Sequence, residues 1–426
     1  MRSTLFYIPP ELFDVPLFGV GWVLGVWTLV GVALLWCLVR MQGWNRDTAS
    51  YVPFLLVVAG AIVFLLPNMV EVDPSGKPLG IPVRGFGVML MLATIAGVGL
   101  GVYRARQMGL DPEVMYSLAF CMFLAGIVGA RLFYVVQNWQ EEFQQPTIAA
   151  TLGALLNVTK GGLVVFGSVL AALPVGIWFL RKRGLPVLAI ADVIAPSMVV
   201  GQAIGRIGCF LNGCCFGGVC LTAPYAMTFP AESPPYVQHE AAGWRSGVWL
   251  EVAQERVRVA YIAPQSAAAN KGLKPNDIPL TINGASFRSL AEARQLLAAG
   301  KGIYEIETAD GRVHRWTAPE PPARSVPIHP TQLYAAVDAA LLALVLWFYY
   351  PYRRRDGEVF ALLVTLHPIS RFVLETIRSD EPGQFGTEWT ISQWLSVAIL
   401  AGACLLWWYI ERQPRGSALP LAGARS

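Results

Sequence analysis

The chain has 426 residues, of which 55% are hydrophobic and only 14% are charged, and its mean hydropathy is +0.49. This composition excludes an ordinary soluble globular protein and indicates a polytopic membrane protein. The formal net charge of +4 is too small to argue for nucleic-acid binding, and no basic run carries the interleaved aromatic residues that such binding needs.

Apolar stretches long enough to cross a bilayer as a helix recur along the chain. We predict about nine spans, at residues 17–39, 52–69, 84–104, 114–137, 161–180, 187–210, 331–350, 358–378 and 390–411. Basic residues gather in every second loop, at Arg40 and Arg46, Arg104 and Arg106, Arg181–Arg183, Arg353–Arg355, and Arg412 and Arg415. The positive-inside rule therefore predicts an amino terminus outside the cytoplasm and a carboxyl terminus inside it.

One segment, residues 221–324, contains no run that could span a bilayer. Residues 248–262 alternate like a pair of strands, residues 289–300 have helical spacing, and residues 302–318 alternate again. The sequence Gly272-Leu-Lys-Pro-Asn-Asp277 and the triplet Ile282-Asn-Gly284 resemble a PDZ domain of the bacterial protease-associated type, over residues 245–318. The charge rule places this β-rich insert outside the cytoplasm.

The PDZ resemblance implies that a peptide adds a strand at a sheet edge while backbone amides hold its terminal carboxylate. The predicted peptide groove is formed by Gly247, Val248, Trp249 and Leu250, and the expected ligand is an exported peptide. A spacer or stabilising domain without a ligand is the alternative.

Arg206 follows a long apolar run and lies in the glycine-rich stretch of residues 201–218, GQAIGRIGCFLNGCCFGG. A charge near the bilayer centre costs about 2.5–3.5 kcal/mol on insertion scales, and glycines allow a helix or a lipid phosphate to approach closely. Arg206 is therefore either a snorkelling interfacial residue or an anion-binding residue that faces the protein interior.

Other polar residues also lie in or beside apolar helices, and by default such residues indicate a functional site. Arg371 and Glu375 are four apart on one helical face, and Arg378 follows. The others are His329, Gln332, Tyr334, Gln393, Arg131 and Tyr134. Loop alternation places Arg206, Arg371, His329 and Gln393 in the outward half of the membrane, so we expect them to converge.

Seven cysteines lie mostly inside apolar runs and are typical of small buried residues. Cys209, Cys214, Cys215 and Cys220 form a cluster with no histidine nearby in sequence. We predict no metal site there, and a disulfide within the cluster stays open.

From Ile81 onward, without the insert, the chain resembles prolipoprotein diacylglyceryl transferase. The matching segments are IPVRGFGVM at 81–89, GIVGARLFYVV at 126–136, GGLVVFGSV at 161–169, GRIGCFLNGCCFG at 205–217, HPTQLY at 329–334, RFVLETIR at 371–378 and ISQWLS at 391–396. The resemblance implies a seven-helix enzyme of the bacterial inner membrane that uses no cofactor. Such an enzyme moves the diacylglyceryl group of phosphatidylglycerol onto the lipobox cysteine sulfur of a preprolipoprotein.

The expected organisation is an extra helical hairpin (1–80), a transferase core in two parts (81–220 and 325–412), the insert (221–324) and a cytoplasmic tail (413–426). By resemblance, Arg206, Asn212 and Gly217 belong to the phosphatidylglycerol signature, and Arg371 and Glu375 match paired essential positions. The predicted catalytic residues are Arg206, Arg371, Glu375 and His329. The predicted lipid-binding residues are Arg206, Asn212, Gly217, Arg131, Arg378, Gln332 and Tyr334.

The chain departs from the family pattern at several positions. Phe166 occupies the position of the histidine that is the usual candidate base, while Cys209 replaces an asparagine and Cys214 a glutamate. Phe86 replaces a frequent tyrosine and Ala335 a glutamate. Either the proton acceptor has moved, or the activity is altered or lost.

The chemistry needs a thiolate to attack and a positive group to receive the departing phosphate. Planar arginine side chains match phosphodiester oxygens, so Arg206 and Arg371 would clamp the headgroup. A free thiol with a pKa of about 8.5 is mostly protonated near neutral pH. Glu375 and His329 are the remaining candidate bases, although Glu375 is also suited to orienting Arg371.

Two other function classes were considered. A metalloprotease of the membrane needs His-Glu-x-x-His, but His239-Glu240 is followed by Ala-Ala-Gly, which excludes it. A catalytically silent scaffold that binds lipid and exported peptides is the alternative to the transferase.

Overall fold

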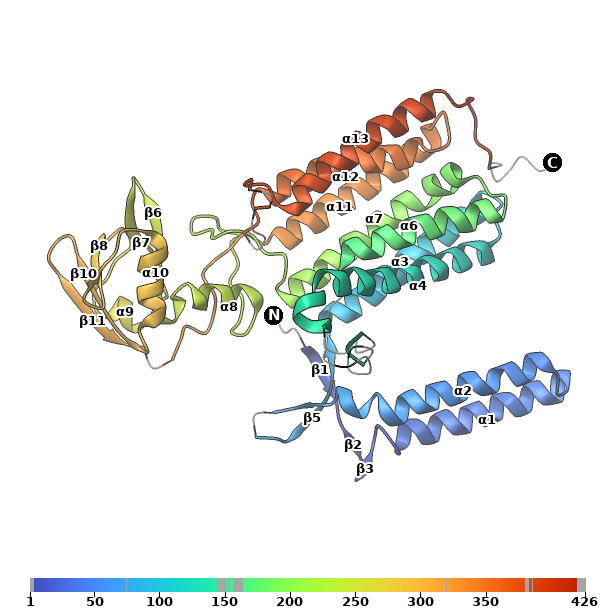
Figure 1. Cartoon of the computed structure of the whole chain (residues 1–426), viewed down its shortest axis with the longest axis horizontal. Helices are drawn as coiled ribbons and strands as arrows, with labels where there is room; N and C mark the ends of the chain where they lie inside the picture. Colours follow the sequence, from blue (N-terminus) through green and yellow to red (C-terminus); the bar gives the residue numbers. More distant parts are fainter. Residues whose placement is uncertain are drawn as a thin grey trace. The chain divides into compact units, whose positions relative to one another are not determined.

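The structure is a computed structural model that describes residues 4–73, 75–144, 147, 151, 153–155, 164–318, 320–379, 383–384 and 386–419. It divides into two compact units (Figure 1). The first comprises residues 1–88 with 211–213, and the second comprises residues 89–210 with 214–426.

The first unit combines a helical hairpin with two small sheets. Helices α1 (Trp22–Gln42) and α2 (Arg46–Phe64) pack together, and the Trp27 indole donates to the Leu55 carbonyl at 3.1 Å. Strands β1 (Thr4–Ile8), β5 (Pro78–Arg84) and β4 (Glu71–Val72) form an antiparallel sheet in that order, and β2 (Glu11–Leu12) pairs with β3 (Val15–Pro16). At Gly80 a Cβ atom would lie 2.0 Å from the Ile8 carbonyl oxygen, so only glycine fits.

Seven further helices correspond to the other predicted spans. They are α3 (Gly85–Gln107), α4 (Pro112–Gln137), α6 (Val165–Lys182), α7 (Val187–Asn212), α11 (Thr331–Tyr349), α12 (Glu358–Glu375) and α13 (Ile391–Glu411). Helix α4 packs on α6, and α12 packs on both α11 and α13. Helix α7 supplies the centre of the core, because Ala189, Ile190 and Val193 are fully buried among residues such as Leu346 and Val359.

Close approach of α4 and α6 depends on two facing glycines. A Cβ atom at Gly129 would lie 2.4 Å from the Gly167 carbonyl oxygen, and one at Gly167 would lie 2.3 Å from the Gly129 oxygen. The two backbones therefore touch at a point where any larger residue would push the helices apart.

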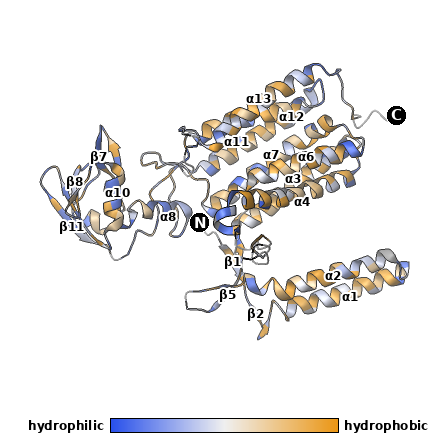
Figure 2. Cartoon of the chain, viewed as in Figure 1, coloured by the Kyte–Doolittle hydropathy of each residue, from blue (hydrophilic) through white to orange (hydrophobic). Residues whose placement is uncertain are grey.

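Six helices among the described residues are long and apolar enough to cross a membrane: α1, α3, α4, α7, α11 (extended through the short turn η4, Tyr350–Tyr352) and α13. Helices α2, α6 and α12 lie at the other predicted spans but fall outside the same limits of length and composition. Apolar residues dominate all of these helices (Figure 2). The protein is therefore a polytopic helical membrane protein.

The segment after α7 contains the β-rich insert. A four-stranded antiparallel sheet has the order β11-β10-β8-β9, and β6 and β7 form a separate hairpin. The bounds are α8 (Pro234–Ala241), η3 (Trp244–Ser246), β6 (Val248–Ala253), β7 (Arg256–Ile262), α9 (Ala267–Asn270), β8 (Pro279–Ile282), β9 (Ala285–Ser286), α10 (Leu290–Ala299), β10 (Ile303–Thr308) and β11 (Val313–Thr317). Leu250, Ile282, Leu297 and Ile306 share one buried core between the strands and α10.

Two backbone segments on either side of the insert pair with one another. The Gly217 amide donates to the His329 carbonyl at 3.1 Å, and the Cys220 amide donates to the Pro327 carbonyl at 2.9 Å. Further along, Met227 and Ile328 exchange two backbone hydrogen bonds, and Ser325 donates to the Phe229 carbonyl. We call this pairing of residues 217–230 with residues 324–329 the insert neck.

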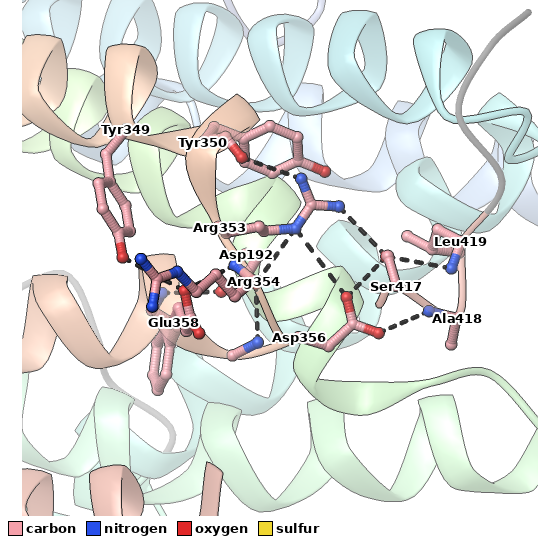
Figure 3. A network of polar contacts seen from close by, with 12 residues as sticks. Asp192, Tyr349, Tyr350, Arg353, Arg354, Asp356, Glu358, Ser417, Ala418 and Leu419 are labelled. Carbon is pink, nitrogen blue, oxygen red and sulfur yellow. Dashed lines mark hydrogen bonds and ion pairs between the residues drawn. The ribbon is translucent and has the colours of Figure 1, made fainter. Parts of the chain in front are cut away.

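A buried polar network joins the beginning of α12 to α7 and to the segment after α13 (Figure 3). Asp192 has no exposed surface, and its two carboxylate oxygens accept the amides of Gly357 at 2.7 Å and Phe360 at 2.9 Å. The carboxylate thus caps the amino-terminal end of α12, where free amides and the helix dipole favour negative charge. Arg353 lies 3.7 Å from Asp192 and 3.9 Å from Asp356. Asp356 in turn accepts the Ser417 hydroxyl at 2.6 Å and the Ala418 amide at 2.7 Å.

Other short elements complete the chain. These are the turn η1 (Pro67–Met69) after α2 and the π-helical turn η2 (Trp139–Phe143) after α4.

Candidate active site

The end of α12 carries a buried carboxylate between two arginines. Glu375 Oε2 lies 2.8 Å from Arg371 Nη2 and 3.0 Å from Arg378 Nη1, and its Oε1 accepts the Thr390 hydroxyl at 3.1 Å. The helical spacing of three and four residues puts both guanidinium groups on the face of Glu375. Both carboxylate oxygens are therefore occupied, and the carboxylate holds the two cations in place.

The two arginines differ in exposure. The Arg378 side chain is 4% exposed, whereas that of Arg371 is 17% exposed and also donates to the Ser392 hydroxyl at 3.1 Å. Ser392 lies in the first turn of α13, which begins with a capping box between Thr390 and Gln393. Gln393, which was predicted to belong to the site, thus caps α13 and fixes the backbone that supports Arg371.

Arg206 occupies the last third of α7 and is half-buried. It makes no hydrogen bond or ion pair with any residue that the structure describes. Its charge acts on His367 together with that of Arg371, and on Cys215 together with that of Arg378. Arg206 of α7 thus acts on the same groups as Arg371 of α12 and Arg378, which follows α12, although Arg206 is far from both in the sequence.

The turn after α7 is held against the start of α11. Gln332 Nε2 donates to the Cys214 carbonyl at 2.8 Å, and the Thr331 hydroxyl donates to the Cys215 carbonyl at 2.8 Å. Gly217 is packed too tightly for a side chain, because an added Cβ would lie 2.7 Å from both His329 Cβ and Thr331 Cγ2. The structure therefore gives Gln332 and Gly217 supporting contacts beside the arginines. Asn212 is the last residue of α7 and is half-buried.

His329 belongs to an aromatic group. Its Nδ1 lies 3.3 Å from the Tyr334 hydroxyl, and the Tyr225 ring lies near both residues, with centroid distances of 6.4 Å and 6.3 Å. This setting provides His329 with a hydrogen-bonding partner within the protein.

Arg131 and Phe166 lie on the touching helices α4 and α6. Arg131 donates to the carbonyls of Ala154 at 2.9 Å and Leu155 at 3.2 Å, and its guanidinium lies 5.6 Å from the Tyr134 ring centroid. Phe166 is half-buried and precedes Gly167, the residue at which the two helices touch. Arg131 thus uses its donors to hold the helical residues 153–155.

Three thiols gather beside the arginines. The sulfur atoms of Cys209, Cys214 and Cys215 lie within 4.8 Å of one another. Cys220, five residues further along the chain, is buried. All seven cysteines are free thiols, so no disulfide forms within the cluster. Three thiols at this separation have the donor chemistry for a soft metal ion. The prediction that no metal binds there stays a prediction.

The predicted peptide groove of the insert is closed. Val248, Trp249 and Leu250 are buried, and the amides of Gly247 and Val248 already donate to the Trp244 carbonyl at 2.9 Å and the Ser246 hydroxyl at 3.1 Å. Arg294 of α10 donates to the Leu250 carbonyl at 2.9 Å and lies over the Trp249 ring. A peptide that adds a strand beside β6 would have to displace these internal bonds.

Sequence analysis missed three ionisable residues inside apolar helices: Asp192 in α7, Asp338 in α11 and His367 in α12. The same rule that singled out Arg206 would have found them, because any ionisable residue within a membrane-length span calls for an explanation. His367 and Asp338 lie close to the arginines, whereas Asp192 belongs to the network at the beginning of α12.

Comparison with known proteins decides the family. The family model described as prolipoprotein diacylglyceryl transferase matches residues 77–409, which include all the arginines of the site. The chain belongs to the prolipoprotein diacylglyceryl transferase family. A relative from Rhodopirellula baltica, named phosphatidylglycerol–prolipoprotein diacylglyceryl transferase, is 33% identical over 95% of this chain and 88% of its own length.

Other members of the prolipoprotein diacylglyceryl transferase family match less of the chain or at lower identity. The Synechococcus elongatus protein of the same name is 31% identical over 41% of this chain and 56% of its own length. A Clostridium perfringens protein, named as the second such transferase, is 22% identical over 78% of this chain and 93% of its own length. The family match runs across the insert, which is therefore part of a continuous transferase chain.

Proposed function

We propose that this protein transfers the diacylglyceryl group of phosphatidylglycerol to the lipobox cysteine thiol of preprolipoproteins, the first step of bacterial lipoprotein maturation. Membership of the transferase family and the near full-length relationship to the Rhodopirellula baltica protein support this function. The apolar helices place the enzyme in a membrane, which we take to be the bacterial inner membrane.

The observation that carries the mechanism concerns Arg206, whose guanidinium makes no hydrogen bond or ion pair with any described residue. A half-buried cation without an anion partner among those residues leaves its charge uncompensated, which is costly in a membrane helix bundle. Its charge reaches His367 along with that of Arg371, so a phosphodiester between the two arginines would satisfy both. Two planar, permanently charged groups suit the two free oxygens of that headgroup.

The reaction then follows from the charges. The thiolate sulfur attacks the glyceryl carbon that bears the phosphate, a carbon–sulfur bond forms and the carbon–oxygen bond breaks. The electron pair of the broken bond leaves with glycerol phosphate, whose charge rises from −1 to −2. Arg206 and Arg371 stabilise this added charge in the transition state more than in the bound lipid, which is the requirement for catalysis.

Glu375 acts as a positioning residue in this scheme. Its oxygens accept from Arg371, Arg378 and Thr390, and its side chain has no exposed surface that a substrate thiol could reach. It keeps Arg371 in one rotamer and neutralises part of the positive charge before the lipid enters. Arg378, almost fully buried, stabilises the carboxylate and adds its charge to the same region.

We further propose nine membrane spans, with the amino terminus outside and the insert on the same exoplasmic side. The alternating basic loops support this topology, and nine helices lie at the nine predicted positions. On this arrangement the site at the end of α12 faces the outer leaflet, where a preprolipoprotein emerges.

The insert is proposed to be a PDZ-like domain. Its four-stranded sheet, the β6–β7 hairpin and the two helices α9 and α10 support that architecture. Binding of an exported peptide requires Arg294 to release the Leu250 carbonyl, so the closed form is expected to bind peptides weakly.

The test is an assay of the purified full-length protein in detergent with phosphatidylglycerol and a synthetic lipobox peptide. Mass spectrometry should detect a peptide whose mass has increased by one diacylglyceryl group, together with free glycerol phosphate. Absence of both products, under conditions where the Rhodopirellula baltica relative is active, would favour a silent scaffold that binds lipid.

A further inference from the structure

The transfer reaction needs a group that accepts the proton of the substrate thiol, and the predicted candidates are poorly placed for it. Glu375 is fully buried and is held by two arginines and a hydroxyl. His329 Nδ1 lies against the Tyr334 hydroxyl within an aromatic group. Phe166 has no titratable atom. A thiol with a pKa of about 8.5 would then be only a few per cent ionised at neutral pH.

His367 is the remaining histidine of the helix bundle. It lies on α12 one turn before Arg371, so the two side chains share a helical face. Neither ring nitrogen makes a hydrogen bond with any residue that the structure describes, and Nδ1 is a buried atom without a partner. A buried polar nitrogen that lacks a partner is costly, and it indicates a ligand or a chemical role.

Three charged residues act electrostatically on the imidazole: Asp338 of α11, Arg206 of α7 and Arg371 of α12. The Ser370 hydroxyl, which lies one turn after His367 on α12, donates to Asp338 Oδ2 at 2.8 Å and fixes that carboxylate. An imidazole that bonds to no described residue and feels the charge of a fixed carboxylate has the features of a general base whose protonated form is stabilised by a neighbouring anion.

We propose that His367 is the general base that takes the proton from the lipobox thiol, with the carboxylate of Asp338 stabilising the imidazolium that forms. This inference rests on the proposed transferase function and names the base of that same site. In the step, the thiol proton passes to an imidazole nitrogen while the sulfur bonds to the glyceryl carbon. The phosphate leaves with the electron pair of the broken carbon–oxygen bond. The imidazolium then returns its proton to the departing phosphate dianion or to water, so protons and charges balance.

The position of the two arginines fits this assignment. A neutral imidazole does not compete for the phosphate, while the carboxylate of Asp338 offsets the positive charge that appears when the imidazole is protonated. The same imidazolium is created next to the place where the leaving phosphate gains its second negative charge. Proton uptake and charge development therefore support one another in the same step.

The experiment compares a lipobox peptide with its selenocysteine analogue on wild-type protein and on His367→Gln. A selenol is already ionised at neutral pH and needs no base. We expect His367→Gln to transfer to the thiol peptide about 10²–10⁴-fold more slowly than wild type, the range for loss of a general base. On the selenol peptide the two proteins should differ by no more than about threefold. A merely structural role would slow both substrates equally.

Three controls make the result decisive. His314→Gln, a histidine replacement in the insert, should leave both rates unchanged. Asp338→Asn should lower the thiol rate about tenfold and spare the selenol rate, because it removes the negative charge that stabilises the protonated base. Should His367→Gln fail to fold, His367→Ala with imidazole in the buffer replaces it, and imidazole should restore thiol transfer.

The proposal is overturned if His367→Gln keeps the wild-type rate on the thiol peptide, or loses the same factor on both peptides. It is also overturned if His329→Gln, rather than His367→Gln, shows the thiol-specific loss. These outcomes differ from failure of the proposed function, in which wild-type protein forms neither the thioether nor the selenoether. That last result would remove both proposals.

Discussion

Two buried carboxylates of the helix bundle, Asp192 and Glu375, are both surrounded by donors and arginines, but their networks differ in one respect. The Asp192 network is closed, because its arginine, Arg353, is only 6% exposed and contacts two carboxylates. The Glu375 network is open, because Arg371 keeps 17% of its side chain exposed and Arg206, whose charge acts on the same histidine, bonds to no described residue. A closed network joins helices, whereas an open one keeps positive charge available to a substrate anion.

The largest effect is expected from opening the closed network. Asp192→Ala leaves Arg353 without its fully buried partner and frees the amides of Gly357 and Phe360. Removing one member of a buried ion pair costs about 3–5 kcal/mol, so the free energy of unfolding should fall by that amount. Thermal and denaturant unfolding in detergent would measure it.

Asp356→Ala is the matched control for this change. The Asp356 side chain is 17% exposed and its partners are the Ser417 hydroxyl and the Ala418 amide near the chain end. Its loss should cost about 1 kcal/mol. Equal losses in the two variants would contradict the view that Asp192 is the centre of the network.

The open network should respond in the opposite way. Arg206→Ala should lower transfer by about 10²–10³-fold, the range for removal of one group that stabilises developing charge. It should leave the unfolding temperature unchanged, because Arg206 makes no bond to any described residue. Rates and melting curves of the same preparations would be compared.

Arg353→Ala supplies the reverse case, with lower stability but an unchanged rate per folded molecule. The comparison would break down if Arg206→Ala unfolded the protein, or if Arg353→Ala abolished transfer while the protein stayed folded.

A smaller effect is expected from the turn that supports the open network. Gly217→Ala places a methyl group 2.7 Å from His329 Cβ and Thr331 Cγ2, which forces the turn to move at a cost of about 1–3 kcal/mol. In Gly218→Ala the nearest atom is the Ile377 carbonyl oxygen at 3.7 Å, so that variant should be stable.

Because Gly217 faces Arg378 in a β-bridge, Gly217→Ala should also slow transfer, while Gly218→Ala should not. Gly217 could affect transfer by supporting the turn or by binding lipid directly. Measuring lipid binding and stability of the same variant distinguishes these two explanations. A direct lipid-binding role would weaken binding in a variant that remains as stable as wild type.

The smallest effect concerns the buried side chain of His239. Its charged neighbour, Arg294, is positive and therefore opposes protonation of the imidazole. Burial, reinforced by the charge of Arg294, lowers the pKa of His239 to about 4. The unfolded chain binds a proton below pH 6.5 that the folded insert refuses until about pH 4, so stability should fall as the pH drops through this window. The slope attributable to His239 is at most about 1.4 kcal/mol per pH unit.

Unfolding of wild type and His239→Gln between pH 7 and pH 4 would isolate this contribution. The variant should show a shallower decline on acidification than wild type. Parallel curves would mean that His239 has the same pKa in the folded and unfolded states.

Much of the fold was predictable because apolar length and charge alternation dominate membrane helices. All nine predicted positions hold helices, and the insert strands lie where the alternation predicted them. The small sheets of the first unit were not predicted, because β1 to β5 are short and take their partners from segments up to 80 residues away. Helix α2 begins at Arg46, earlier than predicted, because Asn45 caps it through the Thr48 amide.

The site was predictable only in its charged residues. The spacing of Arg371, Glu375 and Arg378 predicted a shared helical face, and the ion pairs lie there. The third contact of Glu375 was not predictable, because its donor, the Thr390 hydroxyl, belongs to the N-cap of the next helix, α13. His367 could have been singled out as an ionisable residue within an apolar span, but its lack of a partner among the described residues is visible only in the structure.

The insert neck has an evolutionary consequence. Its two chain segments leave and re-enter the helix bundle side by side, and the Cys220 amide donates a hydrogen bond to the Pro327 carbonyl. A gene segment spliced between such neighbouring points adds a domain without altering the distance that the surrounding helices must bridge. The β-rich insert can therefore be gained, exchanged or deleted as a unit while the helix bundle is inherited intact.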